Sequence, residues 1–259
     1  MPRRRPNQMR PVALRPHVLV HPEGSVLAAY GDTQVLVAAS IDDRVPAWLA
    51  GRGSGWVDAE YGMLPRATHT RSPRDSQRPR PNGRALEIGR LVGRSLRAAV
   101  DLKRLGERTI TIDCDVVQAD GGTRTAAITG GYVALAVAIA HLGRRTPLPA
   151  GVLRGRVSAV AVGLVDGVAQ VDLDYAMDSR AEVDLNVVMA GDGRLVEIQG
   201  TGESGHFSTS QLVDMLALAE ATRPGLEAAQ DAAVGAPFHH RGLGADLVAD
   251  GEVAGPGGA

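Results

Sequence analysis

The stretch RTITIDCDVVQADGGTRTAAITGGYVALAVAIAH, residues 108–141, decides how the chain folds. Its first part alternates apolar and polar residues, which predicts a half-buried strand with one face formed by Ile110, Ile112, Cys114 and Val116. The long apolar run that follows predicts a helix ending at about His141. Two glycines, a threonine and an arginine separate the two elements, so the question is what this junction holds.

The junction has the composition of an anion site. Backbone N–H groups at the start of a helix are unpaired, and the helix dipole adds partial positive charge there. Glycines let the main chain approach a ligand closely, and an arginine can donate two hydrogen bonds to phosphate oxygens. We therefore predict that Gly122, Thr123 and Arg124 form a phosphate cradle. No Gly-Lys-Ser/Thr follows, so it is not a Walker loop, and the alternative is a plain strand-to-helix turn with a surface arginine.

A second cluster, DLDYAMDSRAEVDLNV at residues 172–187, is rich in carboxylates. Asp178 and Asp184 bracket a short connection, and if it folds back they can share a hard divalent cation with waters completing its shell. The alternation around Leu173 places Asp172 and Asp174 on the opposite face, so we expect them to line the solvent side. A solvated acidic loop is the alternative for the whole cluster.

The rest of the chain predicts an α+β fold of mixed sheets with packed helices. We expect one domain over residues 1–232, built of two similar β-then-α halves at 10–142 and 152–232, and a tail at 233–259. Hairpin turns are predicted at Gly31-Asp32, Asp166-Gly167 and Asp192-Gly193. Apolar spacing predicts one helix over 85–105, and a capping box from Ser208 to Gln211 starts a closing helix. The Arg- and Pro-rich segment 66–84 is expected to be an extended or mobile loop.

Composition narrows the class of protein. Of the 259 residues, 44% are hydrophobic, enough to bury a sizeable core. Cys114 is the one cysteine; it excludes an internal disulfide framework, and we expect it to be a small buried apolar residue. No signal-peptide apolar region follows the basic start, and the run YVALAVAIA is too short to span a membrane, so we expect a soluble cytoplasmic protein.

The charge is unevenly distributed along the chain. Residues 1–110 carry 19 Lys and Arg against 10 Asp and Glu, whereas residues 111–259 carry 9 against 19. A basic half attracts polyanions and clustered carboxylates attract divalent cations, and enzymes acting on nucleic acid need both. A coincidence of surface composition is the alternative.

Four motifs together resemble the bacterial ribonuclease PH family: GWVDAEYGMLPRATHTR, GRALEIGRLVGRSLRAAVDL, DCDVVQADGGTRTAAITG and VDLDYAMDSRAEVDLNVVM. The resemblance runs in unbroken order from about Met9 to Ala229. It implies a ribosomal-protein-S5-like fold with a left-handed βαβ crossover. It also implies phosphorolytic trimming of transfer RNA precursors and other RNA 3′ ends, with inorganic phosphate as co-substrate, release of nucleoside diphosphates, and assembly as a hexameric ring of three dimers.

The resemblance also implies roles for particular residues. Phosphate would be held by Arg84 together with the triplet Gly122, Thr123 and Arg124. The metal-linked and catalytic aspartates of the family match Asp178 and Asp184, with Mg²⁺ as the implied cation. Arginines tied to transfer RNA binding and subunit contact match Arg66, Arg71 and Arg74, and the two roles stay open for them. The loop SPRDSQRPRP at 72–81 departs from the family pattern.

Two other functions compete with this one. A catalytically silent ring subunit that threads RNA is expected to lack one of the two clusters, and both are present here. A small-molecule kinase of related fold is expected to carry an ATP-gripping glycine loop, which the sequence does not offer.

Overall fold

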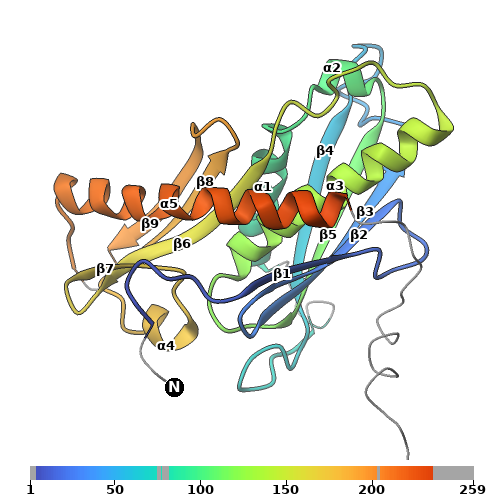
Figure 1. Ribbon diagram of the computed structural model, residues 1–259. Helices are drawn as coiled ribbons and strands as arrows, with labels where there is room; N and C mark the ends of the chain where they lie inside the picture. Colours follow the sequence, from blue (N-terminus) through green and yellow to red (C-terminus); the bar gives the residue numbers. More distant parts are fainter. Residues whose placement is uncertain (1–3, 75–76, 78–81, 203–204, 236–259) are drawn as a thin grey trace, which may run out of the picture.

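The computed structural model describes residues 4–74, 77, 82–202 and 205–235 and contains two sheets (Figure 1). The first has the order β1-β2-β3-β5-β4, and its strands are β1 Val12–Pro16, β2 Gly24–Tyr30, β3 Thr33–Asp42, β4 Trp56–Met63 and β5 Thr109–Gln118. The second has the order β7-β6-β8-β9, and its strands are β6 Val157–Val165, β7 Val168–Val171, β8 Val183–Ala190 and β9 Leu195–Gly202. The helices are α1 Gly83–Arg97, α2 Leu102–Leu105, α3 Thr123–Arg145, α4 Tyr175–Asp178 and α5 Thr209–Val234. The expected α+β class is confirmed.

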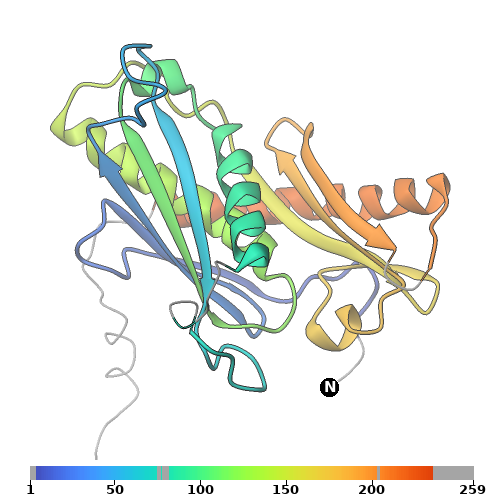
Figure 2. The ribbon, with the colours of Figure 1, turned by 180° about the vertical axis from the view of Figure 1, so that it is seen from behind.

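Sheet pairing is antiparallel except between β4 and β5, which are parallel neighbours joined through α1. Figure 2 shows α1 lying along β4, where it leads back to the start of β5. This is the crossover unit of the fold. It brings the end of β4 and the end of β5 to the same edge of the sheet, which is where the glycine junction begins.

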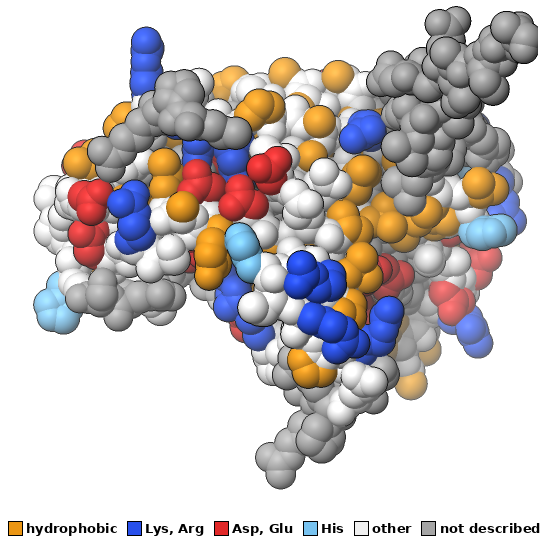
Figure 3. Space-filling model, turned by 90° about the horizontal axis from the view of Figure 1, so that it is seen from below, with side chains coloured by type: hydrophobic (Ala, Val, Ile, Leu, Met, Phe, Trp, Pro, Cys, Tyr) orange, Lys and Arg blue, Asp and Glu red, His pale blue; other side chains and the backbone are white. Residues whose placement is uncertain are grey.

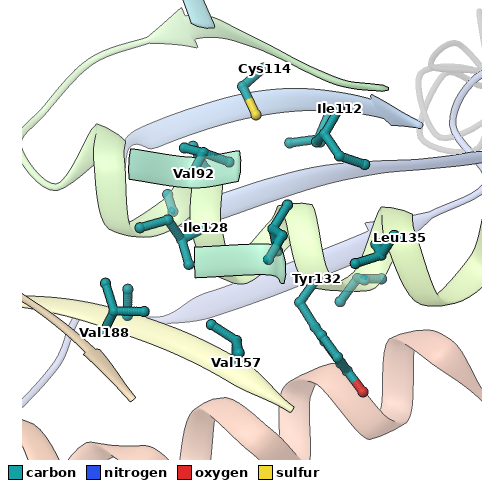
Figure 4. Packing of buried hydrophobic residues seen from close by; sticks show 14 of the residues in the cluster. Val92, Ile112, Cys114, Ile128, Tyr132, Leu135, Val157 and Val188 are labelled. Carbon is teal, nitrogen blue, oxygen red and sulfur yellow. The ribbon is translucent and has the colours of Figure 1, made fainter. Parts of the chain in front are cut away.

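The core lies between the two sheets. Helices α1 and α3 pack on the first sheet, α3 also packs against β6 of the second, and α5 packs on β6 and α3. Figure 4 shows side chains from α1, β5, α3, β6 and β8 meeting in one cluster that includes Val92, Ile112, Cys114, Ile128, Leu135, Val157 and Val188. Cys114 is 2% exposed, so its expected role as a small buried residue is confirmed.

Helix α3 is long and apolar enough to cross a membrane by length and composition alone. However, 83% of its most apolar window is buried inside the protein, as in the core helix of a soluble protein. It comes very close to β2, because a Cβ on Gly130 would lie 2.7 Å from the Cβ of Ala28. The helix runs four residues past the predicted end, to Arg145.

The predicted hairpins and strands are confirmed, whereas β1 was not predicted. Prolines at 11 and 16 interrupt the sequence pattern there. The strand forms nevertheless because it is an edge strand, where proline is tolerated. The capping box from Ser208 to Gln211 is present, and α5 continues through Pro224 to Val234, two residues into the expected tail.

The single helix predicted over 85–105 is wrong: α1 ends at Arg97 and α2 begins at Leu102. Between them the backbone turns to pair with residues 152–154, where Val100 forms a bridge with Leu153. The Asp101 side chain then caps α2 by accepting from two backbone N–H groups. Helical spacing continues across the break, which is why the sequence pattern does not reveal it.

The solvent side of β4 and β5 carries acidic residues, which gives a pH-dependent prediction. Glu60 and Asp113 are direct partners in the parallel register. Burial, then Glu60 and Asp115, raise the pKa of Asp113 above its ordinary value. Ionising Asp113 therefore costs stability, a cost that is absent well below the unfolded-state pKa of about 3.9 and grows as the pH rises through and above it.

We expect Asp113→Asn to stabilise the fold at pH 7.5 by roughly 0.2–1 kcal/mol, the scale of cross-strand charged pairs. The gain should shrink as the pH falls toward 4. Urea unfolding at both values, at one protein concentration, checks this. A gain that stays constant or increases on acidification would contradict the sign of the shift.

Two sequence expectations fall outside the described residues. These are the tail from residue 236 onward, and the part of the Arg- and Pro-rich loop at residues 75–76 and 78–81.

Candidate active site

A glycine turn joins β5 to α3. Gly121 and Gly122 have φ values of +74° and +68°, in the left-handed region that glycine reaches without strain. A Cβ on Gly121 would lie 2.3 Å from the carbonyl oxygen of Leu173, so no side chain fits between the turn and the segment after β7. Among the described residues, no side chain caps α3 at Gly122. The turn therefore presents the first N–H groups of the helix to whatever occupies the space in front of it.

A buried ion pair holds this turn in place. Nε and Nη2 of Arg10 donate to the two carboxylate oxygens of Asp172 at 3.0 and 2.8 Å, and these residues are 7% and 1% exposed. The Arg10 guanidinium also donates to the carbonyl oxygens of Asp120 and Gly121. The Thr33 hydroxyl donates to the Gly121 carbonyl at 2.6 Å. Burial alone would lower the pKa of Arg10, but the hydrogen bond and charge of Asp172 raise it above its ordinary value, so the guanidinium stays charged.

The expectation that Asp172 lines the solvent side is wrong. Strand β7 ends at Val171, and Asp172 takes φ +55° with its N–H donating to the Ala161 carbonyl at 2.6 Å. This left-handed residue breaks the alternation and turns the carboxylate inward to Arg10. Asp174 is half-buried rather than solvent-facing, because it caps α4 by accepting from the Met177 N–H at 3.0 Å.

Arg124 has unused hydrogen-bonding capacity. Its side chain is 20% exposed, and Nη2 lies 3.5 Å from Oε2 of Glu87. Its Nε is buried and has no hydrogen-bond partner among the described residues. A buried donor left without an acceptor costs about 1–3 kcal/mol or more, a cost that an anion in front of the guanidinium would remove. Glu87 also accepts a hydrogen bond from the side chain of Gln199 on β9, so Glu87 links Arg124 to the second sheet.

Both predicted clusters line one pocket of about 480 Å³. The lining comes from the glycine turn and the start of α1, from α4 and the start of β8, and from the loop after β4. The lining residues are Met63, Thr68, His69, Thr70, Arg84, Ala119, Gly121, Gly122, Thr123, Arg124, Ala161, Tyr175, Asp178, Asp184 and Asn186. Figure 3 views the molecule from below, where α4 and the loop after β4 lie, and Arg or Lys side chains gather on one side of a His side chain and Asp or Glu on the other.

Comparison with known proteins identifies the family. Domain 1 of the 3′ exoribonuclease family (RNase PH) matches residues 8–140, and domain 2 of the same family matches residues 155–222. The chain belongs to this 3′ exoribonuclease family. The two matched domains meet at the pocket, since the predicted phosphate cradle lies in the first and both aspartates lie in the second.

Solved structures share the fold of this RNase PH family member. Rice (Oryza sativa) Rrp46 is 18% identical, with a TM-score of 0.73 over 89% of this chain and 97% of that one. The Archaeoglobus fulgidus exosome with RNA bound to the active site is 22% identical, with a TM-score of 0.74 over 87% and 90%. An archaeal exosome core is 21% identical, with a TM-score of 0.69 over 88% and 89%. At these identities the likeness establishes the fold.

The structure brings together six of the nine predicted site residues: Arg84, Gly122, Thr123, Arg124, Asp178 and Asp184 all line the pocket. The other three, Arg66, Arg71 and Arg74, are exposed on the loop after β4 and do not line it. Arg66 donates to the His69 carbonyl at 2.9 Å, so it shapes the rim of the pocket from outside. The roles of all nine residues stay predictions.

The predicted metal site rests on Asp178 and Asp184. Within the described residues, no group of three or more His, Cys, Asp or Glu side chains is arranged to hold a metal ion. Mg²⁺ commonly uses one or two carboxylates, with waters and substrate phosphates completing an octahedron. Two carboxylates that line the same pocket, together with the amide of Asn186, fit this pattern.

Sequence reasoning missed Arg10, Tyr61, His69, Tyr175 and Asn186. All but Arg10 lie inside the four quoted motifs, so the family resemblance contained them without giving them a role. Their positions identify them here: Arg10 clamps the turn, and His69 and Tyr175 bring their rings to 5.3 Å from each other at the pocket. Arg10 has no local signal, because its partner lies 162 residues away in the sequence.

Proposed function

We propose that the protein is a phosphorolytic 3′-to-5′ exoribonuclease that trims the 3′ ends of transfer RNA precursors. Inorganic phosphate attacks the terminal phosphodiester and releases a nucleoside diphosphate, and the reverse reaction adds nucleotides from diphosphates. One observation carries the proposal: the start of α3, Arg124 and two carboxylates line the same pocket, and among the described residues the buried Arg124 Nε has no hydrogen-bond partner.

The positively charged groups that line the pocket offset the main electrostatic obstacle to the reaction. Phosphate must approach a phosphodiester that is also anionic, and two unit charges about 4 Å apart repel by about 4 kcal/mol at an effective dielectric constant near 20. Arg84 and Arg124 supply fixed positive charge beside the helix start, where N–H groups and the dipole favour an anion. The N–H groups are fixed by the helix backbone and Arg124 is anchored by Glu87, so little reorganisation of these groups is needed at the moment of reaction.

The carboxylates of Asp178 and Asp184 complete the proposed site. Asp178 lies at the end of α4 and Asp184 at the start of β8, so both come from the second half of the chain. Bound there, Mg²⁺ would neutralise charge on the scissile phosphate and on the leaving 3′ oxygen. We assign proton transfer at the 3′ oxygen to one of the same two carboxylates.

RNA would approach across the basic rim. Arg66, Arg71 and Arg74 are exposed beside the pocket, and contacts of this kind with phosphates give affinity without reading sequence. The same arginines are candidates for contacts between subunits in a hexameric ring of three dimers. The ring is supported by the shared fold with exosome proteins, one of which is described with RNA bound to its active site.

The products of one reaction test the proposal. The purified protein is incubated with a 3′-extended transfer RNA precursor, Mg²⁺ and phosphate, and the released nucleotides are separated. Nucleoside diphosphates that appear only with phosphate support phosphorolysis. Monophosphates would mean hydrolysis, and retention of RNA without release would mean a scaffold subunit; either result overturns the proposal.

Removing the Arg124 guanidinium should weaken phosphate use specifically. We expect Arg124→Gln to raise the half-saturating phosphate concentration by roughly 10- to 100-fold, the range of lost hydrogen bonds to a charged group, while RNA affinity changes little. Phosphate titration of nucleoside diphosphate release checks this. Arg194→Gln, in the exposed turn between β8 and β9, is the matched control. An unchanged phosphate requirement in Arg124→Gln would show that Arg124 does not contribute to phosphate binding.

A further inference from the structure

A buried tyrosine reaches the phosphate cradle from the neighbouring strand. Tyr61, near the end of β4, is 9% exposed, and its hydroxyl donates to Oγ1 of Thr123 at 2.8 Å. Thr123 is the first residue of α3 and lines the pocket between Gly122 and Arg124. Tyr61 itself does not line the pocket. Any effect of Tyr61 on a ligand in that space must therefore act through Thr123.

The direction of this hydrogen bond decides what the threonine can do. A hydroxyl has one proton to donate and two lone pairs that can accept. When Tyr61 donates to Thr123, it occupies a lone pair and leaves the Thr123 proton for another acceptor. In the described part of the chain, Thr123 Oγ1 has no second hydrogen-bond partner. The remaining proton therefore has an acceptor only if the pocket supplies one.

The next threonine on the helix shows the contrast. The Thr125 hydroxyl donates back to the carbonyl of Gly122 at 2.9 Å, so its proton is used within the protein. Hydroxyls at helix starts commonly bond to nearby backbone in this way. Thr123 differs because its side chain is held by Tyr61 from outside the helix.

The surroundings keep Tyr61 in its donating form. Burial raises the pKa of Tyr61 above its ordinary value, against the opposite effects of Thr123, Arg84 and Arg124. The phenol therefore keeps its proton near neutral pH and stays able to donate to Thr123.

We propose that Tyr61 is a positioning residue that commits the Thr123 hydroxyl to donating a hydrogen bond to inorganic phosphate. This inference rests on the proposed function. Phosphate oxygens accept hydrogen bonds, so a hydroxyl fixed as a donor suits them. Without Tyr61, the Thr123 hydroxyl is free to rotate and to donate elsewhere, and its donation to phosphate is no longer prepared in advance.

The test is Tyr61→Phe, which keeps the ring and removes one oxygen. We expect the half-saturating phosphate concentration to rise about tenfold, with turnover at saturating phosphate and RNA affinity within about twofold of the original protein. A merely structural role would instead lower turnover, RNA affinity and thermal stability together, without a selective change for phosphate. That pattern, or an unchanged phosphate requirement, would overturn the proposal.

A double-variant cycle makes the test independent of any packing change. Thr123→Val removes the hydroxyl but keeps the shape of the side chain. If Tyr61 acts through Thr123, adding Tyr61→Phe to Thr123→Val weakens phosphate binding no further. Two losses that simply multiply would show that Tyr61 does not act through the hydroxyl.

Direct binding separates this inference from the proposed function. Calorimetric titration of the RNA-free protein with inorganic phosphate measures the affinity without any reaction. A protein that binds phosphate in a Tyr61-dependent way but releases no nucleoside diphosphate would refute the proposed function and leave the positioning role intact. Normal phosphorolysis with a Tyr61→Phe variant that binds phosphate unchanged would refute the positioning role alone.

Discussion

Asp184→Asn should lower turnover by roughly 10²- to 10⁴-fold, the range attributed to acid–base groups, while the protein still binds RNA. Asp184 lies at the start of β8 and faces the same pocket as the phosphate cradle. Replacing its carboxylate by an amide removes a negative charge, a proton acceptor and a ligand suited to Mg²⁺, but changes the shape very little. The residues of the predicted phosphate cradle are left intact, so the loss of turnover should appear in the chemical step.

The measurement is single-turnover release of nucleoside diphosphate at saturating phosphate and Mg²⁺, with RNA affinity measured separately. Asp192→Asn, in the exposed turn between β8 and β9, is the matched control and should retain activity. Full activity of Asp184→Asn at trace Mg²⁺ would exclude this carboxylate from the reaction. Loss of RNA binding in parallel with turnover would instead indicate a role in holding the substrate.

Arg10→Met should destabilise the fold by up to about 3–5 kcal/mol, because it removes the main partner of the buried Asp172 carboxylate. Asp172 keeps only the backbone N–H of residue 10 and the longer contact with Arg4 at 3.5 Å. Asp172 is 1% exposed and receives three hydrogen bonds from Arg10, one of them from the backbone. The variant also removes the donors that hold the carbonyls of Asp120 and Gly121. We therefore expect weaker phosphate binding even under conditions where the variant remains folded.

Urea unfolding at a fixed protein concentration measures the loss. Arg44→Met, which breaks an exposed pair with Asp42, serves as the control and should leave stability nearly unchanged. The double variant Arg10→Met/Asp172→Asn should recover part of the loss, because it no longer buries a charged group that has lost its main partner. A destabilisation of Arg10→Met as small as that of the control would show that the ion pair does not hold the turn.

The order of the elements around the site could be predicted from sequence. The alternation of apolar and polar residues predicted β5, and Asp-Gly pairs predicted the turns after β6 and β8. The glycine pair predicted the start of α3. Each of these signals is local, because it depends on which face a side chain takes or on φ values that glycine reaches easily. The family motifs then predicted the phosphate-binding residues and the two aspartates, and Arg124, Asp178 and Asp184 line one pocket in the structure.

Failures of prediction came where distant contacts override a local pattern. The helix expected through residue 105 breaks because residues 99–101 pair with residues 152–154. Asp172 was placed on the solvent side by alternation, but its left-handed backbone turns it toward Arg10, 162 residues earlier. Edge strand β1 was not predicted because proline, present here as Pro16, is tolerated in a strand mainly where one side of the strand is unpaired.

The sequence by itself determined the strand, turn and helix that build the cradle and the residue types that line the pocket. Only the tertiary structure decided that Tyr61 donates to Thr123, that Glu87 approaches Arg124 and that Arg10 clamps the turn. The physical reason is that the backbone conformation of a residue, and the face of the strand or helix on which its side chain lies, depend on the few residues around it in the sequence. Hydrogen-bond partners far apart in the chain are chosen by strand order and by how closely the two sheets pack on the helices between them.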